Sequence, residues 1–306
     1  MSIDDVVAEA RSTSNNDSQP VSFSCKIIFS HFFNSKYKSL TMLDRLFEKL
    51  DRRSFLHFHI WEFAYRSFFK EYARLFFLKA MLKHPLKTVS GLKDYHCFIK
   101  SKENLFPQYQ KFLAIPNDET FEDQIGQQKT RPMLGLGFCL KPYDPQDNTR
   151  SCPSGRANHD CLYLEKGETQ NVCHGCAIYR IAKKGMESGC SIYIMTSAKD
   201  IAIDFLLPQI NKGLFPTSIL LLCPYSVQAI LPSLFICGMD AFLLAYDGGY
   251  CKDYKEWRLA DLGDKENRTT LSKESSEKLF GLISQRGVSE ASPQSFRREG
   301  NIFYPE

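Results

Sequence analysis

The stretch from residue 177 to residue 246 alternates between short apolar runs and segments of helix length. Three runs are typical of buried strands: SIYIMTS at 191–197, TSILLLC at 217–223 and DAFLLAY at 240–246. Three segments between or before them are typical of helices: AIYRIAKKGMESG, AKDIAIDFLLPQINKG at 198–213, and VQAILPSLFICG at 227–238, broken or restarted at Pro232. Because strands that alternate with helices form βαβ units, the pattern predicts an α/β fold with a small Rossmann-like parallel sheet.

The rest of the chain suggests three parts. Residues 1–20 are rich in Ser, Asn and Asp and predict a flexible tail. Residues 21–130 predict a helical, aromatic-rich region that ends in a polar connection, and residues 131–306 predict a cysteine-rich α/β domain with peripheral elements and a polar tail at its end. The helical N-terminal part therefore precedes the sheet.

The aromatic segment Phe55–Leu82 raises the question of a membrane. Charged residues interrupt it, so no apolar run reaches the roughly 20 residues that span a bilayer. We expect a helix that is mostly buried against protein and ends near Lys83, His84 and Pro85. Peripheral contact with a membrane surface is the alternative, since Lys, Arg, Trp and Phe together suit an interface.

Charge and cysteine content restrict the location and the partners. A formal charge of +4 is too small to indicate nucleic acid without a concentrated basic patch. The first residues lack the basic start and apolar core of a secretory signal. Eleven cysteines, an odd number, do not resemble a small secreted disulfide scaffold. We therefore expect a cytoplasmic protein with free thiols.

Several catalytic patterns are missing. PMLGLGFCLKP carries Gly135 and Gly137 but no glycine at position 140, so the dinucleotide fingerprint fails. The sequence has no P-loop and no HExxH motif, nor a Ser/His/Asp spacing that would indicate a hydrolase.

Four cysteines lie in a stretch with little secondary-structure pattern. Eight, eleven and two residues separate them in turn, and they are Cys152, Cys161, Cys173 and Cys176. A loop with few apolar residues needs another source of stability, and a tetrahedral thiolate site would supply it. We expect these four to be metal ligands. For Cys173 and Cys176, a redox pair or ordinary core residues are the alternatives.

The predicted topology brings further residues to the same place. In a right-handed βαβ arrangement, helices begin at the edge where parallel strands end. The CHGC pair opens a helix, Cys223 ends the second strand, and Asp247 and Cys251 follow the third. Cys223 and Cys251 are thus alternate ligands or substrate-side thiols, and Asp247 either binds a substrate or makes a turn.

Cysteine spacing also bears on the cofactor. Iron–sulfur clusters take thiolates from flexible loops, and helix N-termini favour thiolates. Zinc uses the same ligands, but the common zinc ribbon has two CxxC pairs, and only one is present here. We therefore favour an iron–sulfur cluster, with zinc as the alternative. The other polar candidates near the cysteines are His159, His174 and Arg156, each as plausible in a structural role. The remaining cysteines, among them Cys25, Cys97, Cys190 and Cys237, are expected to be small core residues.

CHGCAIYRIAKKGMESGCSIYIMTS, then LLLCPYS, then a cysteine after the next strand resembles a cysteine-rich domain family of unknown function from bacteria and archaea. The resemblance covers about the second half of the chain. It implies an α/β domain with a metal or iron–sulfur site and supplies no reaction. Together with the spacing, it favours a redox or electron-transfer protein that acts on a small-molecule substrate or a redox partner protein. A zinc-stabilised binding or scaffold module, whose aromatic helices face a partner or a membrane, is the second hypothesis.

Overall fold

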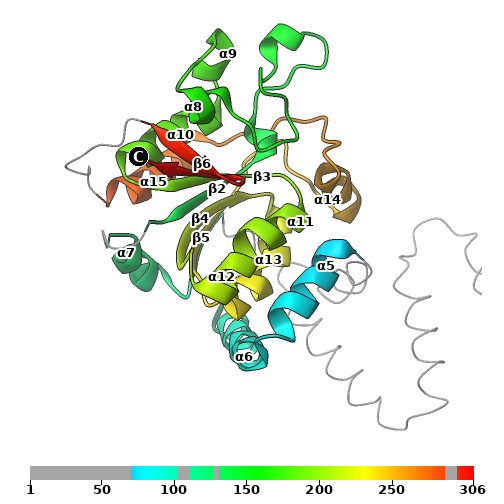
Figure 1. Ribbon diagram of the computed structural model, residues 1–306, viewed down its shortest axis with the longest axis vertical. Coiled ribbons are helices and arrows are strands. Elements are labelled where there is room, and N and C mark those ends of the chain that lie inside the picture. Colours follow the sequence, from blue (N-terminus) through cyan, green and yellow to red (C-terminus); the bar gives the residue numbers. More distant parts are fainter. Residues whose placement is uncertain (1–69, 103–110, 127–130, 287–294) are drawn as a thin grey trace, which may run out of the picture. The chain divides into compact units, whose positions relative to one another are not determined.

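The computed structural model describes residues 70–102, 111–126, 131–286 and 295–306 (Figure 1). Within these ranges, seven strands form one sheet in the order β1-β5-β4-β2-β3-β7-β6. The strands are β1 (Phe112–Ile115), β2 (Met133–Gly137), β3 (Ser191–Met195), β4 (Thr217–Leu222), β5 (Asp240–Ala245), β6 (Phe296–Glu299) and β7 (Ile302–Pro305).

Four neighbouring strands of this sheet are parallel. β2 pairs in parallel with both β3 and β4, and β4 pairs in parallel with β5. β1 joins β5 antiparallel at one edge, while β7 joins β3 antiparallel and continues into β6 at the other. The fold is therefore mixed α/β, with a parallel centre and antiparallel edges.

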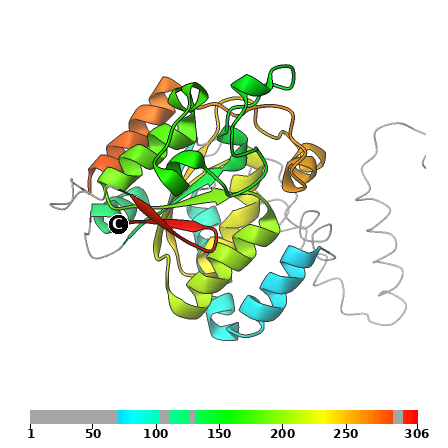
Figure 2. The same cartoon turned by 45° about the horizontal axis from the view of Figure 1, so that its top comes forward.

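Helices cover both faces of the sheet (Figures 1 and 2). On one face lie α7 (Asp118–Gly126), α10 (Ala177–Glu187) and α15 (Lys273–Ser284). On the other lie α11 (Ala198–Ile201), the π-helical η6 (Ala202–Leu206), α12 (Leu207–Lys212) and α13 (Pro224–Ile236). Outside this second layer pack α5 (Glu71–Phe76), the π-helical η2 (Phe77–Met81) and α6 (Pro85–Lys102), and α14 (Tyr254–Asp261) contacts α13.

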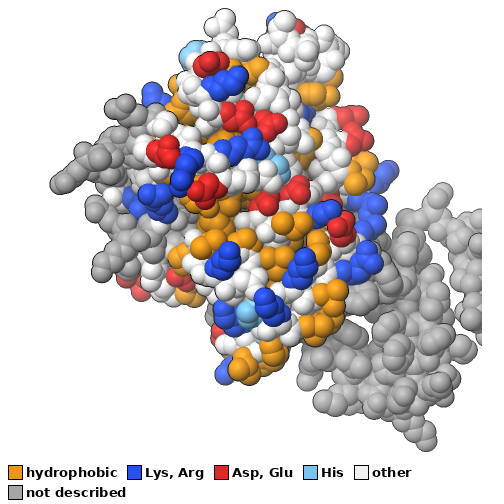
Figure 3. Space-filling model, in the orientation of Figure 1, with side chains coloured by type: hydrophobic (Ala, Val, Ile, Leu, Met, Phe, Trp, Pro, Cys, Tyr) orange, Lys and Arg blue, Asp and Glu red, His pale blue; other side chains and the backbone are white. Residues whose placement is uncertain are grey.

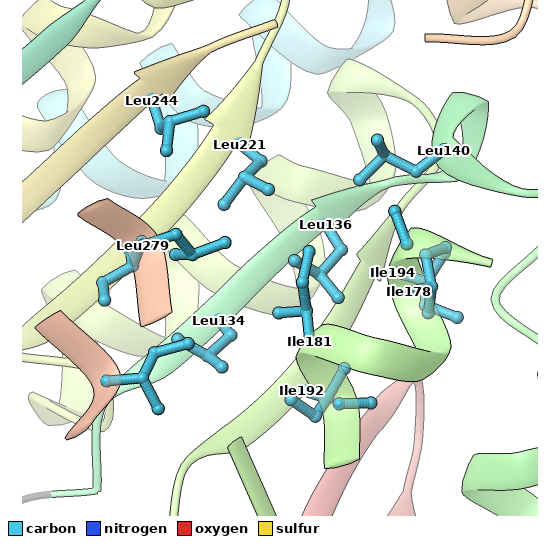
Figure 4. Close-up of a cluster of buried hydrophobic side chains, with 14 of the residues drawn as sticks. Leu134, Leu136, Leu140, Ile178, Ile181, Ile192, Ile194, Leu221, Leu244 and Leu279 are labelled. Atoms are coloured by element: carbon cyan, nitrogen blue, oxygen red, sulfur yellow. The ribbon is translucent and has the colours of Figure 1, made fainter. Parts of the chain in front are cut away.

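Alternate side chains of the parallel strands form the main core (Figure 4). Leu134 and Leu136 of β2 point to the same side as Ile192 and Ile194 of β3, where Ile181 of α10 meets them. These side chains are all but inaccessible to solvent. Because the central strands are buried on both faces, they lack the alternation of polar and apolar residues found in half-exposed strands.

The predicted strands and helices between residues 177 and 246 are confirmed, with one exception. Pro232 neither breaks nor restarts its helix, because α13 runs continuously across it. Leu231 and Leu234 on either side of it are buried. Their packing offsets the cost of an interior proline, about 3 kcal/mol.

Two strands and a helix before residue 138 lie where no such element was expected. β2, at the centre of the sheet, comes from PMLGLG, whose glycines weaken the strand signal. A Cβ on Gly135 would approach Leu220 to 2.6 Å, so the small residue makes room for a neighbouring strand. β1 and α7 come from the stretch expected to be a polar connection, so the boundary placed at residue 130 cuts through the α/β domain.

The polar C-terminal tail is also corrected by the structure. It contains the hairpin of β6 and β7, which turns at Gly300. Three of the four residues of β6 are exposed, and two of these are arginines, as in edge strands that avoid pairing with other chains. A strand without an apolar face gives no periodic signal in the sequence.

The expected tail at 1–20 and most of the aromatic helix lie outside the described residues. From residue 70 the chain is helical, in agreement with the prediction, and α6 starts anew at Pro85. The described end of the predicted aromatic helix is less buried than expected, because Leu78 and Leu82 are 59% and 58% exposed. Figure 3 shows hydrophobic side chains at the lower end of the molecule and basic and acidic side chains mixed over the visible face. No helix within the described ranges has the length and hydropathy needed to cross a bilayer.

The contact between α6 and α13 depends on a glycine. A Cβ at Gly91 would lie 2.5 Å from the Cα of Ile236 and 2.6 Å from the carbonyl oxygen of Phe235. We expect Gly91→Ala to force the helices apart and lower the free energy of unfolding by about 1–3 kcal/mol. Gly281→Ala, at an exposed position of α15 with nothing near the new methyl group, should instead raise it by roughly 0.5–1 kcal/mol. Urea unfolding of the two variants measures both changes, and equal effects would contradict the close contact.

Candidate functional site

Three cysteines meet where the parallel strands end. Cys139 follows β2 in the short 3₁₀ turn Phe138–Leu140, Cys223 directly follows β4 as the N-cap of α13, and Cys251 follows β5. We call Cys139, Cys223 and Cys251 the rim thiols. All three are buried. Cys223 and Cys251 had been expected at this edge, while Cys139 was missed because β2 was not recognised as a strand.

Polar contacts join the rim thiols to one another and to Lys265 and Thr269, which follow later in the chain. The backbone N–H of Cys251 donates to the Cys223 sulfur at 3.4 Å. The Lys265 ammonium donates to the Cys251 sulfur at 3.2 Å, and the Thr269 hydroxyl donates to the Cys139 sulfur at 3.3 Å. Each sulfur therefore has a polar neighbour although it is shielded from water.

These contacts separate the acidities of the rim thiols. A hydrogen bond from the Cys223 thiol, reinforced by Lys265, lowers the pKa of Cys251 to about 6 against the opposing effect of burial. A hydrogen bond from the same thiol lowers the pKa of Cys139 to about 7, and donation to these sulfurs raises the pKa of Cys223. One S–H can point to only one sulfur at a time, and the ammonium makes Cys251 the stronger acceptor. The favoured arrangement is a Cys251 thiolate beside a protonated Cys223.

The four cysteines predicted as ligands line a second site, a small pocket at the start of α10. We call Cys152, Cys161, Cys173 and Cys176 the pocket thiols. The pocket encloses about 20 Å³, enough for one water molecule, and its wall also includes Tyr163, Ile178 and Tyr179. Residues 152–176 thus bring four sulfur-bearing side chains to one cavity.

Helix starts position two of the pocket thiols. Cys161 is the N-cap of α8 (Leu162–Lys166), and Cys176 is the N-cap of α10. Cys173 lies in the single turn α9 (Asn171–His174), and its carbonyl accepts from the Cys176 N–H at 2.9 Å. The free N–H groups of a first turn carry partial positive charge, which favours a nearby thiolate.

Burial of the pocket thiols opposes this effect. It raises the pKa of Cys161 to about 11, although N–H groups of α8 act in the other direction. Burial also raises the pKa of Cys152 and of Cys176. Unlike Cys251, these three sulfurs are thiols at neutral pH, and a bound metal would have to displace their protons.

A buried ammonium holds the segment that carries Cys152 and Cys161. Lys141 is 1% exposed, and its Nζ donates to the carbonyl oxygens of Gly155, Asn158 and Asp160 at 2.8–3.1 Å and to the Asn158 side-chain oxygen at 2.6 Å. Burial lowers the pKa of Lys141, while neighbouring thiols and Asp160 act in the opposite direction. The loop therefore has a source of stability besides the predicted metal, because the hydrogen bonds of Lys141 also hold it.

The pocket thiols are not arranged tightly around a point. Among the described residues, no three His, Cys, Asp or Glu side chains are grouped so that they could hold one metal ion. The same statement applies to the rim thiols, which contact one another in a chain with Cys223 at its centre. Whether either group takes a metal stays a prediction.

One segment, residues 265–270, contacts both the rim thiols and the CHGC sequence that carries two of the pocket thiols. Besides the contacts of Lys265 and Thr269 with the rim thiols, Arg268 donates to the carbonyl oxygen of Gly175, inside the CHGC sequence, at 2.8 Å. Thr270 forms a β-bridge with Gly248. Gly249 has φ +64°, and a Cβ there would lie 2.0 Å from the Arg268 carbonyl oxygen. The Gly-Gly pair therefore lets this segment lie directly against the strand-end rim.

The remaining candidates have structural partners. The Asp247 carboxylate lies 2.6 Å from the Lys111 ammonium and accepts from the Ser272 N–H at 2.7 Å. The His159 ring contacts the end of β3, with Nδ1 2.7 Å from the Ile194 carbonyl oxygen and Nε2 3.1 Å from the Thr196 hydroxyl. His174 lies edge-on to the Tyr179 ring.

Arg156 and the cysteines outside the two groups of thiols were the other residues singled out in the sequence. Arg156 donates to the carbonyl oxygens of Glu266 and Asn267 and stacks on Tyr143. Cys190 and Cys237 are buried, as expected for core residues, whereas Cys97 is exposed. Cys25 lies outside the described residues.

The role of Lys141 can be tested by removing its charge. Lys141→Met keeps the length of the side chain but leaves three backbone carbonyls without their donor, so we expect the free energy of unfolding to fall by roughly 2–4 kcal/mol. Hydrogen exchange of residues 152–161 should become faster than in the wild type. The control Lys273→Met, on a side chain that is 90% exposed, should change neither quantity. Unchanged exchange in Lys141→Met would contradict the role assigned to the ammonium.

The chain was compared with protein-family models, with curated proteins and with solved structures, and no match was found. The resemblance to a cysteine-rich family therefore stays a prediction that rests on the cysteine spacing alone.

Proposed function

We propose that this protein binds an iron–sulfur cluster through Cys152, Cys161, Cys173 and Cys176 and serves a redox or electron-transfer role toward a small-molecule substrate or a redox partner protein. The observation that carries the proposal is that these four cysteines line one pocket. Four thiolates from irregular segments and helix starts are a donor set that iron–sulfur clusters use. The proposal places the protein in a reducing compartment, the cytoplasm, and treats the parallel strands as a Rossmann-like unit with a cysteine-rich loop.

The spacing of the sulfurs bears on the choice between a cluster and a single ion. In a four-iron cluster each thiolate binds a different iron, and in a two-iron cluster two thiolates bind each iron, so the four sulfurs need not converge on one point. A zinc ion requires all its sulfurs at about 2.3 Å from one centre. The lack of a convergent group of three among the described residues therefore weighs more against zinc than against a cluster.

Lys141 supports an anionic group at this place. Its positively charged ammonium donates to the carbonyl oxygens of Asn158 and Asp160, in the segment between Cys152 and Cys161. Four thiolates bring negative charge that a buried cation stabilises. When bound, a cluster would supply one-electron redox chemistry, while the residues of this chain would hold it, exclude water and balance its charge.

Zinc is the second candidate, because a pocket of about 20 Å³ suits a single ion better than a cluster. A zinc site would stabilise the segment between β2 and α10 and make the protein a binding or scaffold module. The exposed leucines of η2 and α6, such as Leu78 and Leu86, would then face a partner protein or a membrane surface.

Anaerobic purification followed by metal analysis and an absorption spectrum separates the two candidates. A cluster gives iron, sulfide and a broad visible absorption, while zinc gives no colour. We expect Cys161→Ser and Cys176→Ser each to lose most of the bound metal, because each removes a thiolate ligand. Cys97→Ser, at an exposed position, is the matched control and should retain it. If the wild type contained neither iron nor zinc near stoichiometry, the proposal would fail.

The pH dependence of metal binding follows from the raised thiol pKa values. Because protons compete with the metal and the pKa of Cys161 is about 11, affinity should increase as pH rises and decrease as pH falls over the whole neutral range. Competition with a chelator at pH 6, 7 and 8 measures this trend. An affinity independent of pH would show that thiols with raised pKa values are not the ligands.

A further inference from the structure

The rim thiols form a reactive arrangement that the proposed metal site does not use. They lie beyond the ends of β2, β4 and β5, the position at which open parallel sheets bind ligands. The pocket thiols come from residues 152–176, which follow Cys139 and precede Cys223 and Cys251 in the chain. Chemistry at Cys139, Cys223 and Cys251 therefore uses none of the proposed metal ligands.

The contacts of Cys251 prepare its sulfur to act as a nucleophile. The Lys265 ammonium lies 3.2 Å from this sulfur and stabilises its anionic form. Lys265 is itself partly exposed, so the sulfur that it contacts lies close beneath the surface. The pKa of about 6 agrees with a thiolate at neutral pH.

Cys223 is placed to react next. The Cys251 N–H donates to its sulfur at 3.4 Å, which holds the two residues against each other across the strand-end rim. Cys223 keeps its proton, since donation to its neighbours raises its pKa. A protonated thiol beside a thiolate supplies both the second sulfur and the proton that a disulfide-forming reaction needs.

We propose that Cys223 and Cys251 form a reversible disulfide in response to a small hydroperoxide, with Cys251 as the attacking residue, Cys223 as the resolving residue and Lys265 as a positioning residue. The Cys251 thiolate attacks one peroxide oxygen, the O–O bond breaks, and Cys251 becomes a sulfenic acid while hydroxide leaves and takes up a proton. The Cys223 sulfur then attacks the Cys251 sulfur, the S–O bond breaks, and the Cys223 proton leaves with the hydroxyl group as water. Two thiols lose two electrons in total, and hydrogen peroxide is reduced to two waters.

Cys139 has a different place in this arrangement. Its sulfur accepts from the Thr269 hydroxyl, and its carbonyl oxygen accepts from the Thr269 N–H at 3.0 Å. It lacks the ammonium contact that Cys251 has. We therefore assign the first oxidation to Cys251 and not to Cys139.

The test is oxidation of the full, anaerobically purified protein with hydrogen peroxide, followed by blocking of free thiols and mapping of disulfide-linked peptides. The expected product is a peptide pair joined through Cys223 and Cys251, reversed by a dithiol reductant. A pair joined through Cys139 and Cys223 would overturn the assignment, as would the absence of any linkage at Cys251. A link between Cys173 and Cys176 alone would also overturn it, since it would place the peroxide reaction at the pocket thiols.

Variants of the lysine test the positioning role. Lys265→Met should slow peroxide oxidation of Cys251 at pH 6.5 by roughly tenfold, the fall in thiolate fraction expected when a thiol pKa rises from about 6 by about one and a half units. Lys265→Arg should restore most of the rate. Equal rates in all three proteins would exclude a role for the ammonium, and circular dichroism with thermal unfolding confirms that each variant is folded.

The pH dependence of thiol labelling in the wild-type protein tests the acidity of Cys251 directly. The rate of iodoacetamide labelling of Cys251 should reach half its maximum near pH 6. Cys190 and Cys237, whose pKa values burial raises to about 12, are internal controls and should stay unlabelled at that pH. A midpoint for Cys251 near 8.5, the value of an ordinary thiol, would overturn the proposal.

Discussion

The buried ammonium of Lys141 is the interaction on which the cysteine-bearing part of the fold depends. It donates to the backbone of Gly155, Asn158 and Asp160, so a polar stretch with few apolar side chains still keeps one conformation. A buried charge is costly unless its hydrogen bonds are satisfied, and here the carbonyl groups satisfy them. The same charge that orders the segment also leaves a positive potential next to Cys152 and Cys161.

The second constraint is the shared direction of β2, β3, β4 and β5. Parallel strands must end at one edge, so residues far apart in sequence meet there without a loop designed for that purpose. Cys139, Cys223 and Cys251 meet in this way. The segment 265–270 then covers that edge, and glycines at 248 and 249 allow its backbone to approach.

The sequence was informative where apolar patterns were strong. The strands β3, β4 and β5 and the helices between them follow from runs such as TSILLLC, and from their direction follows the meeting of Cys223 with Cys251. Elements without such a pattern were missed. β2 contains two glycines, β1 has only four residues, and β6 is largely exposed. Because Cys139 follows β2, missing that strand meant missing the third rim thiol.

The contacts of single polar residues could not be predicted from the sequence, for a different reason. Lys141, Lys265 and Arg268 look like ordinary charged residues in the sequence, and only the tertiary structure brings them to buried carbonyls and thiols. Asp247 shows the converse. Its position after a strand suggested a substrate ligand, and the structure engages it with Lys111 and Ser272.

A short run of chain, Lys265 to Thr269, connects the rim thiols with the CHGC sequence. Lys265 and Thr269 contact Cys251 and Cys139, and Arg268 between them contacts Gly175 in the CHGC sequence. A change at one end that displaces this run therefore alters the contacts at the other. If binding at the pocket thiols shifts the equilibrium for modification of the rim thiols, that modification must change the affinity of the pocket by the same factor.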